Sequence, residues 1–251
     1  MGKTHLIIPD SHAHPDFHNK RFDWLGKLIA DVKPDVVINL GDMADMHSLC
    51  TYDKGKQGYE ARRYQDDINA AQEANERLLA PLRKRKKKLP RLVLTLGNHE
   101  HRINKAISYD ARMLDGTISI KDLGYEHHGW EVHGINEVAV IDGVAYRHHH
   151  TAGVMDRPIG GLNHARSMLL KGHMSSTVGH SHLYDTAEDI RFDGKRILSL
   201  VAGCYVDYPN EWAGRAQERW WSGITIKTNV EDGVYDHQQV SMRTIKKEYS
   251  K

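Results

Sequence analysis

The chain has 251 residues, of which 39% are hydrophobic and 27% are charged. A chain of this length can bury one sizeable core, and we expect a single domain over residues 1–251. The sequence contains no apolar run near the ~20 residues that cross a bilayer. It also lacks the long apolar stretch of a secretory signal and has only Cys50 and Cys204, so we expect a cytoplasmic protein without a membrane partner.

Charge is nearly balanced, with 35 basic and 33 acidic residues. No global field therefore selects nucleic acid as a partner, although a local basic patch still could. Histidine is unusually frequent, at 18 residues, and neutral imidazole is the commonest metal ligand among side chains. The positions of the histidines are therefore central to any functional interpretation.

Short apolar runs predict buried strands along the chain. They lie at residues 5–9, 35–40, 91–96, 137–142, 144–147 and 176–178. Apolar residues at helical spacing predict helices at residues 21–32 and 64–88. The first hundred residues thus alternate between strands and helices, which is typical of a parallel sheet.

The second half of the chain is richer in hairpin signals. Asp-Gly dipeptides at residues 142–143, 193–194 and 232–233 lie between extended runs. A parallel half followed by an antiparallel half predicts an α/β fold in which two mixed sheets face each other with helices outside, a four-layer α-β-β-α sandwich.

Four polar blocks follow predicted strands. DSH at residues 10–12 follows the first strand, GDMAD at 41–45 the second, GNHE at 97–100 the third, and GHSH at 179–182 a later one. Ligands of α/β proteins bind at the carboxyl ends of strands. Any one histidine at a strand end has an ordinary structural explanation, but the ordered set indicates a site.

These blocks resemble the ordered pattern of the calcineurin-like metallophosphoesterases, which is DxH, GDxxD, GNH(D/E), a lone histidine after a strand, and GHxH. Every block is present, and together they span residues 10–182. The resemblance implies a dimetal site at the carboxyl ends of the strands. Its ligands would be Asp10, His12 and His182 for one ion and Asn98, His148 and His180 for the other, with Asp42 bridging both.

The implied cofactors are two divalent transition metal ions. Mixed nitrogen and oxygen ligands fit Mn, Fe, Zn, Ni or Co better than Ca, which prefers oxygen, and of these we expect Mn. Two cations ~3.5 to 4 Å apart can lower the pKa of a shared water to make hydroxide and can clamp the oxygens of an in-line displacement at phosphorus. The resemblance therefore implies hydrolysis of a phosphate ester without a side-chain nucleophile.

Residues beside the ligands are implied to assist the reaction. His99, next to the ligand Asn98, would be the general acid, and Asp45 would favour its imidazolium form. Glu100 and Arg102 complete a GNHExR form that is similar to that of the serine/threonine phosphatases of the superfamily. By that similarity they would form an ion pair that supports the site.

The lone histidine is the least determined ligand, because three consecutive histidines are available. Alternation along a strand puts His148 and His150 on the same face and His149 on the other. His148 comes first after the apolar run and matches the pattern best, while His150 stays an alternative. Two further histidines, His14 and His47, lie close to ligand blocks and could orient the ligands.

Downstream of His148, three side chains are candidates for binding the substrate phosphate. Arg157, His164 and Arg166 flank a glycine-rich loop, and guanidinium groups make bidentate contacts with phosphate. Their alternative explanation is ordinary charge on a loop and a helix surface. The basic run at residues 83–88 could likewise follow a nucleic-acid backbone, but at the end of a helix such a run more often complements the helix dipole.

The substrate class follows from what the motifs lack. The GDMAD block is not followed by the Arg-Gly of protein phosphatases and diadenosine tetraphosphate hydrolases, and the chain resembles compact stand-alone members, including phage-encoded ones that act in the host cytoplasm. Such members commonly act as phosphodiesterases or nucleases, so we expect the substrate to be a phosphodiester of a nucleotide or nucleic acid. A phosphomonoesterase is the alternative, and a catalytically silent scaffold is a third hypothesis.

Aromatic residues at 205–221 could stack on a base or form the interface of a homo-oligomer, although core packing also explains them.

Overall fold

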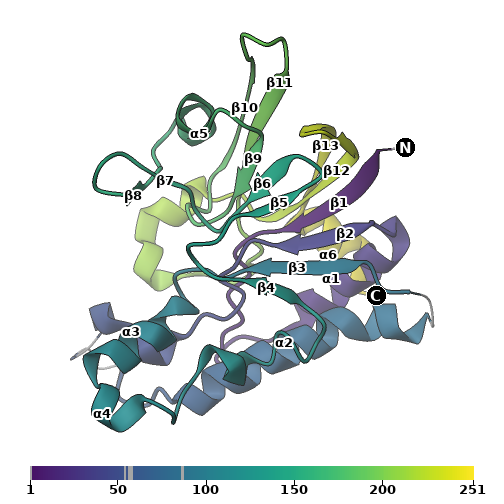
Figure 1. Cartoon of the computed structure of the whole chain (residues 1–251). Helices are drawn as coiled ribbons and strands as arrows, with labels where there is room; N and C mark the ends of the chain where they lie inside the picture. The colour runs from purple at the N-terminus through teal and green to yellow at the C-terminus, as the bar shows by residue number, and fades with distance from the viewer. Residues whose placement is uncertain (1, 54, 56–58, 86–87) are drawn as a thin grey trace.

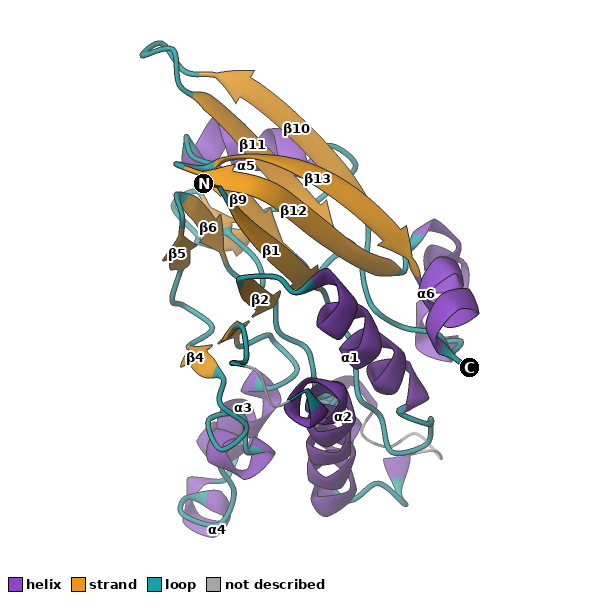
Figure 2. Ribbon diagram, turned by 90° about the vertical axis from the view of Figure 1, so that its right-hand side faces the viewer, coloured by secondary structure: helices purple, strands orange, loops and turns teal. Residues whose placement is uncertain are grey.

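Two mixed β-sheets pack face to face, and helices cover both outer sides (Figure 1). The computed structural model describes residues 2–53, 55, 59–85 and 88–251. In the view turned by 90°, α1, α2 and α6 lie on one side of the strands and α5 on the other (Figure 2). This arrangement is the four-layer α-β-β-α sandwich that the sequence predicts.

The first sheet has the strand order β13-β12-β1-β2-β3-β4. Its strands are β1 (Lys3–Ile8), β2 (Val36–Asn39), β3 (Arg91–Thr95), β4 (Glu131–His133), β12 (Gly223–Glu231) and β13 (Val234–Ser241). The strands β1 to β4 run parallel, whereas β12 is antiparallel to β1 and pairs with β13 as a hairpin. The carboxyl ends of β1, β2 and β3 therefore meet at one edge.

The second sheet has the strand order β10-β11-β9-β6-β5. Its strands are β5 (Ala139–Ile141), β6 (Val144–Tyr146), β9 (Ser176–Val178), β10 (Tyr184–Ile190) and β11 (Arg196–Ala202). The central strand β9 runs parallel to β6 and β11, and the outer pairs are antiparallel. A separate small hairpin consists of β7 (Thr151–Ala152) and β8 (Arg157–Pro158).

The outer layers are helical. The helices are α1 (Lys20–Val32), α2 (Tyr64–Lys84), α3 (His101–Tyr109), α4 (Ala111–Leu114), α5 (His164–Gly172) and α6 (Met242–Tyr249), with 3₁₀ segments η1 (His47–Leu49), η2 (Thr51–Asp53), η4 (Ile120–Leu123) and η5 (Glu211–Arg219). Within the described part of the chain, no helix is both long enough and apolar enough to cross a membrane.

Alternation along the strands divides the core into layers. On β1, Leu6 and Ile8 pack with the helices α1 and α2, whereas Ile7 packs between the two sheets with Tyr146 of β6. A smaller cluster, which includes Met168 of α5, covers the outer face of the second sheet. Both sheets are therefore covered on both faces, which makes them a rigid base for the loops at their carboxyl ends.

Most predicted elements are present with shifted ends. The predicted helix at residues 64–88 ends at Lys84, and residues 86–87 lie outside the described part of the chain. All three Asp-Gly turns connect antiparallel strands, namely β5–β6, β10–β11 and β12–β13. The sequence did not indicate that the last hairpin joins the first sheet, because a turn signal does not say which sheet a strand enters.

Candidate metal centre

The four polar blocks and His148 meet where the parallel strands end. His182 Nε2 lies 3.1 Å from Asp10 Oδ2 and 3.1 Å from His12 Nε2. Asn98 Oδ1 lies 2.8 Å from both His148 Nε2 and His180 Nδ1, and these two nitrogens are 3.1 Å apart. The structure thus brings the seven predicted ligands into two clusters.

Asp42 lies between the two clusters. Its carboxylate belongs to two groups that could each hold a cation, one with His12 and His99 and one with Asp10 and His148, since the ligand atoms of each group lie within 4.8 Å of one another. Its Oδ2 atom is 3.4 Å from His148 Nε2. A bridging role for Asp42 is compatible with this position.

The donor set fits two cations. Pairs of imidazole nitrogens only 3.1 Å apart need a proton or a cation between them, because facing lone pairs repel. Asp10 Oδ1 is buried without a hydrogen-bond partner among the described residues, which is costly for a carboxylate oxygen unless a cation binds it. The mixture of imidazole, carboxylate and amide ligands suits a transition metal better than calcium.

Hydrogen bonds behind the ligands fix their ring orientation. His148 Nδ1 donates to the carbonyl of Leu40 at 2.9 Å, which leaves Nε2 to face Asn98. His12 Nδ1 donates to Asp45 Oδ1 at 2.9 Å, which leaves Nε2 to face His182. Metal-binding histidines usually have such a partner on the second nitrogen.

The backbone of the site is held in uncommon conformations. His12, Asp42, His180 and His182 all have φ between 43° and 68°, a left-handed region that non-glycine residues seldom adopt. Such strain persists where the surroundings over-determine it and is frequent at functional sites. At Gly97 a Cβ atom would collide with the carboxylate of Asp42, so this turn admits only glycine.

Glu100 and Arg102 do not form the predicted ion pair within the described part of the chain. Glu100 accepts hydrogen bonds from the backbone amides of Gly97, Asp42 and Ala44 and from the Tyr125 hydroxyl, at 2.9 to 3.1 Å. Arg102 instead donates to the carbonyls of Asp45 and Met46. The two side chains bind different segments of the GDMAD loop, because they project in different directions at the start of α3.

His99 lies beside the clusters and contacts Asp45. Its Nδ1 atom is 2.6 Å from the Asp45 carbonyl oxygen and 3.3 Å from Asp45 Oδ1, while Arg102 Nη2 lies 3.1 Å from its Nε2 atom. Burial disfavours the charged imidazole, but the carboxylates of Asp42 and Asp45 outweigh this effect and raise the pKa of His99, with Arg102 acting against them. The same carboxylate oxygen, Asp45 Oδ1, lies 2.9 Å from His12 Nδ1 and 3.3 Å from His99 Nδ1, so Asp45 contacts both rings.

Among the three consecutive histidines, the structure brings His148 to Asn98. The strand β6 ends at Tyr146, so alternation does not extend to these residues. His150 lies away from the two clusters, and burial together with the neighbouring Arg147 lowers its pKa to about 4. His149 was not predicted at the site, yet one of its nitrogens lies within 4.8 Å of nitrogens of His148 and His180.

The predicted phosphate-binding residues lie elsewhere. A cavity of about 970 Å³ lies beside the two clusters of predicted ligands, and the described residues that line it do not include Arg157, His164 or Arg166. Arg157 is exposed on β8, His164 is buried at the start of α5, and Arg166 forms an ion pair of 3.0 Å with Asp189 of β10. His164 Nδ1 lies 3.4 Å from the Ser181 hydroxyl oxygen, behind the GHSH block and not in the cavity wall. Closeness to His148 in the sequence therefore did not predict where the three side chains lie.

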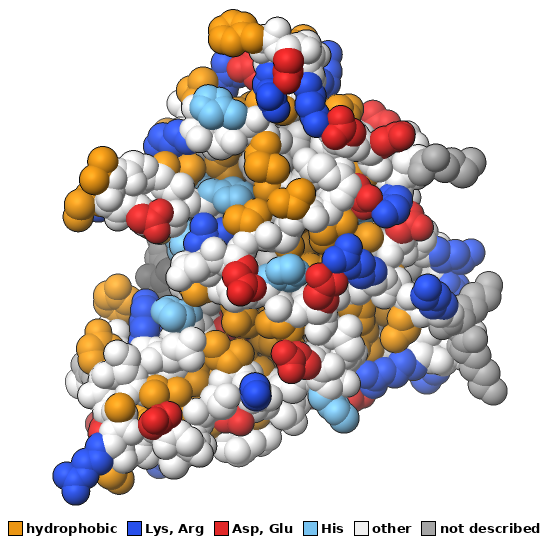
Figure 3. Space-filling view, in the orientation of Figure 1, with side chains coloured by type: hydrophobic (Ala, Val, Ile, Leu, Met, Phe, Trp, Pro, Cys, Tyr) orange, Lys and Arg blue, Asp and Glu red, His pale blue; other side chains and the backbone are white. Residues whose placement is uncertain are grey.

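Other residues line this cavity. Its arginines are Arg62 and Arg102, and its wall also contains His14, Phe17 and His47. The space-filling view shows a hollow at the left edge, between the part that contains α5, β7 and β8 and the part that contains α3 and α4, with histidine and basic side chains around it (Figure 3). In the sequence, the closeness of His14 and His47 to ligand blocks is the one signal that points to them.

The aromatic residues near the end of the chain are mostly structural. Tyr205 and Tyr208 are buried and donate hydrogen bonds to the carbonyls of Arg21 and His12. Trp220 packs edge-on against the ring of His182, with centroids 4.2 Å apart. The side chain of Trp212 lies outside the described part of the chain.

A comparison with known protein families agrees with this geometry. Residues 4–227 match the family model of the calcineurin-like phosphoesterases. No curated protein sequence matches the chain. Similar solved structures include TT1561 of Thermus thermophilus, with 9% identity, a TM-score of 0.41, and coverage of 95% of this chain and 99% of that chain. Another is YfcE, a phosphoesterase from E. coli, with 12% identity, a TM-score of 0.38, and coverage of 95% and 99%.

The family match covers most of the chain and includes all of the polar blocks that converge in the structure. The chain therefore belongs to the calcineurin-like phosphoesterases and is a metal-dependent phosphoesterase.

Proposed function

We propose that this enzyme is a phosphodiesterase that hydrolyses a phosphodiester of a nucleotide or nucleic acid with two divalent transition metal ions, Mn first among them. The observation that carries the proposal is the convergence of the seven ligands beside His99, at one end of a cavity of about 970 Å³. A cavity of this size accommodates a nucleotide-sized ligand.

The chain would hold the ions through the two clusters. Asp10, His12 and His182 form one, Asn98, His148 and His180 form the other, and Asp42 lies between them. When bound, such a pair of cations supplies the Lewis acidity that activates a water for in-line attack and neutralises charge on the phosphoryl oxygens.

His99 is the proton donor in this proposal. Its imidazole is buried beside Asp42 and is held by Asp45 through Nδ1, so Nε2 is the nitrogen that can reach a leaving group. Arg102 now occupies that side at 3.1 Å. An anionic substrate attracts the guanidinium, and a shift of Arg102 Nη2 toward the phosphate, with Nη1 still on the carbonyls of Asp45 and Met46, would release His99 Nε2 for proton transfer.

The charges of the cavity support a diester over a monoester. A monoester carries a second negative charge that needs an additional cationic partner. The cavity wall includes the carboxylates of Asp16, Asp45 and Asp53, and Arg62 already binds Asp53 at 2.7 Å. Among the described residues of the wall, the carboxylates outnumber the two guanidinium groups, those of Arg62 and Arg102, and this balance favours the single charge of a diester.

The test compares bis-p-nitrophenyl phosphate with p-nitrophenyl phosphate as substrates of the Mn-loaded protein. We expect kcat/KM to favour the diester by about tenfold or more, which corresponds to at least ~1.4 kcal/mol of transition-state discrimination. A preference for the monoester would make the enzyme a phosphomonoesterase, and inactivity on both, with no metal bound, would indicate a scaffold. The Asp42→Asn variant controls for contaminating phosphatases.

A further inference from the structure

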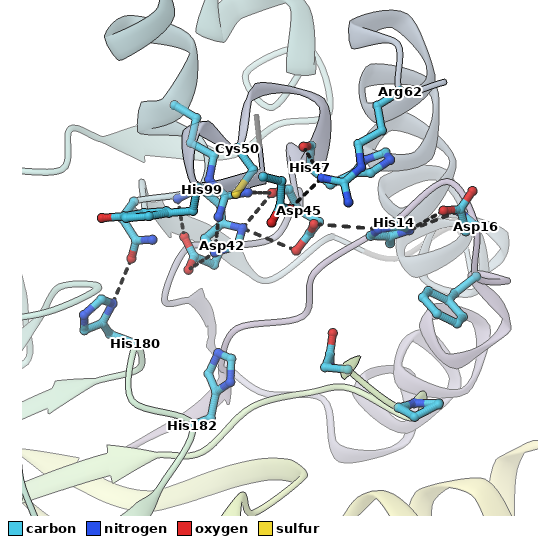
Figure 4. A pocket seen from close by; sticks show the side chains of 17 residues that line it. His14, Asp16, Asp42, Asp45, His47, Cys50, Arg62, His99, His180 and His182 are labelled. Carbon is cyan, nitrogen blue, oxygen red and sulfur yellow. Dashed lines mark hydrogen bonds and ion pairs between the residues drawn. The ribbon is translucent and has the colours of Figure 1, made fainter. Parts of the chain in front are cut away.

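Part of the cavity wall lies outside the two clusters of predicted ligands. It is formed by His14, Phe17, His47 and Arg62, and we call this part the outer arm. In the close-up, His14 and Arg62 lie on the side of the cavity opposite His180, with Asp45 between the two sides (Figure 4). A ligand held at the metal clusters can therefore extend into the outer arm.

The imidazole of His47 is held by a buried carboxylate. Its Nδ1 atom lies 2.6 Å from Oδ1 of Asp67 in α2, and that aspartate is fully buried. Asp67 Oδ2 accepts two further hydrogen bonds, from the backbone amide of Ser48 at 3.0 Å and from its hydroxyl at 2.5 Å. Because Asp67 accepts at Nδ1, the proton of the neutral ring is on Nδ1, and Nε2 is the nitrogen available to a ligand.

The loop that carries His47 is tied down from several sides. Met46 has the left-handed φ of 49°, which costs free energy for a side chain of this size. Arg102 donates to the Met46 carbonyl at 3.2 Å, and Arg62 donates to the His47 carbonyl at 3.1 Å. The position of His47 is therefore fixed before a ligand arrives, as preorganised binding requires.

Several rings lie close together beside His47. The ring of His14 lies 4.2 Å from that of His47, centroid to centroid, with a tilt of 40°. Phe17 is stacked on Tyr208 with centroids 4.0 Å apart and an angle of 9°, and the ring of His14 lies 5.2 Å from that of Phe17. Such a cluster offers flat surfaces for another aromatic ring.

We propose that the outer arm binds the nucleoside part of the phosphodiester, with Nε2 of His47 as a hydrogen-bonding partner and the rings of His14 and Phe17 as a stacking surface. This inference rests on the proposed phosphodiesterase function and names the substituent that the site recognises. A second phosphate group is disfavoured in the arm, because the carboxylates of Asp16 and Asp45 lie beside His14, 3.8 and 3.9 Å from its ring nitrogens. Asp67 is a positioning residue that acts through His47.

The test uses two diesters with the same leaving group, thymidine 5′-(p-nitrophenyl phosphate) and methyl p-nitrophenyl phosphate. They differ only in the retained substituent, so the ratio of their kcat/KM values reports recognition of the nucleoside. The Mn-loaded proteins are wild type, His47→Ala, Asp67→Asn and the control His127→Ala, which changes an exposed histidine outside the cavity. Metal content and melting temperature are measured for each.

We expect the wild type to prefer the thymidine ester and His47→Ala to lower that preference by about tenfold, the effect of losing one hydrogen bond in a buried site. Metal content should stay unchanged, turnover of the methyl ester should fall less than turnover of the thymidine ester, and Asp67→Asn should lower the preference in the same direction. Equal turnover of both diesters by the wild type, or an equal loss for both in His47→Ala, would overturn the inference. Absence of any diester turnover by the wild type would contradict the phosphodiesterase function as well.

Discussion

The imidazole of His99 lies among groups with opposite effects on its charge. Asp42 and Asp45 raise its pKa, whereas burial and Arg102 lower it. Cations bound at Asp42 would neutralise part of the carboxylate effect and so lower the pKa of His99. A general acid works best when its pKa lies near the working pH.

Replacement of His99 by alanine is predicted to separate catalysis from metal binding. The seven ligands remain, so metal content should be unchanged, but the rate should fall by about 10² to 10³-fold. The loss should be larger for alkyl esters than for p-nitrophenyl esters, because alkoxides need a proton to leave. Rates across a series of leaving groups check this, with His101→Ala as the neighbouring control, and a uniform loss would assign His99 to binding.

At the residue scale, the order of the motifs predicted which side chains converge, because strand ends meet at one edge of a sheet. The motifs could not predict that Asp45 is shared between His12 and His99, since hydrogen-bond partners depend on the path of the loops. They also led to Arg157 and Arg166, which close spacing in sequence places near His148 but which the structure places outside the cavity.

At the element scale, the loops after β1 and β2 depend on the helices behind the first sheet. The helices α1 and α2 pack closely, and at Gly26 a Cβ atom would collide with the backbone carbonyl of Leu78 and lie 3.0 Å from Pro81. Arg21 of α1 donates hydrogen bonds to the carbonyls of Ser11 and His12 at 2.7 and 3.0 Å. The placement of α1 therefore affects the position of His12, one of the predicted ligands, directly.

Substitution of Gly26 by alanine is predicted to destabilise the fold. In an open helix this change stabilises by up to ~1 kcal/mol, but here the contact with Leu78 should cost about 1 to 3 kcal/mol and leave a net loss. Gly172→Ala at the end of α5 is the matched control, since nothing lies within 4 Å of its Cβ position. Urea denaturation measures the free energy of unfolding of both variants. A Gly26→Ala protein more stable than wild type would show that α1 and α2 can move apart to accommodate the methyl group without loss of stability.

Helical spacing in the sequence predicted that α1 and α2 exist and roughly where they begin. It could not predict α3, whose nine residues contain one buried apolar residue, Ile103. This helix is specified by its contacts with the GDMAD loop through Glu100 and Arg102 instead of by an apolar stripe. A helix held by such polar contacts cannot be predicted from the spacing of apolar residues.

At the scale of the whole molecule, the space between the two sheets contains a buried lysine. Lys227 of β12 donates a hydrogen bond to the Thr177 hydroxyl of β9, and its Nζ lies 3.9 Å from the ring centroid of Tyr235. The aromatic ring attracts a cation, but complete burial outweighs it and lowers the pKa of Lys227 well below its ordinary value of 10.5. The amine thus links the two sheets by a hydrogen bond, and the free energy needed to keep it uncharged depends on pH.

The stability of the fold is predicted to rise with pH through this lysine. Below pH 10.5 the unfolded chain takes up a proton on Lys227 that the folded chain does not, so stability falls as the pH decreases from 10.5 toward the folded pKa. The slope is at most about 1.4 kcal/mol per pH unit. The Lys227→Met variant lacks this titrating group. Its free energy of unfolding minus that of the wild type should therefore be largest at pH 7 and should decrease toward pH 9.5. Urea denaturation at both values checks this, and a constant difference would mean that the lysine is charged in the folded state.

The sequence predicted the layered α/β architecture because strand and helix patterns alternate in its first half and hairpin signals follow. It did not predict that β12 and β13 complete the first sheet, since pairing of β1 with residues more than 200 positions later is a tertiary event. Nor did it predict the outer arm, which combines residues that follow β1 and β2 with Arg62 before α2. Surfaces assembled from distant segments become visible only in the fold.

The central claim is that the chain binds two metal ions through Asp42 and the two clusters around it. Metal analysis of the Mn-equilibrated and desalted protein tests it directly, with Asp42→Asn beside Asp66→Asn, an exposed control in α2. We predict about two ions per chain for wild type and the control, and one or none for Asp42→Asn, because Asp42 would contribute to both sites. Equal metal content in Asp42→Asn and wild type, with activity retained, would contradict the account.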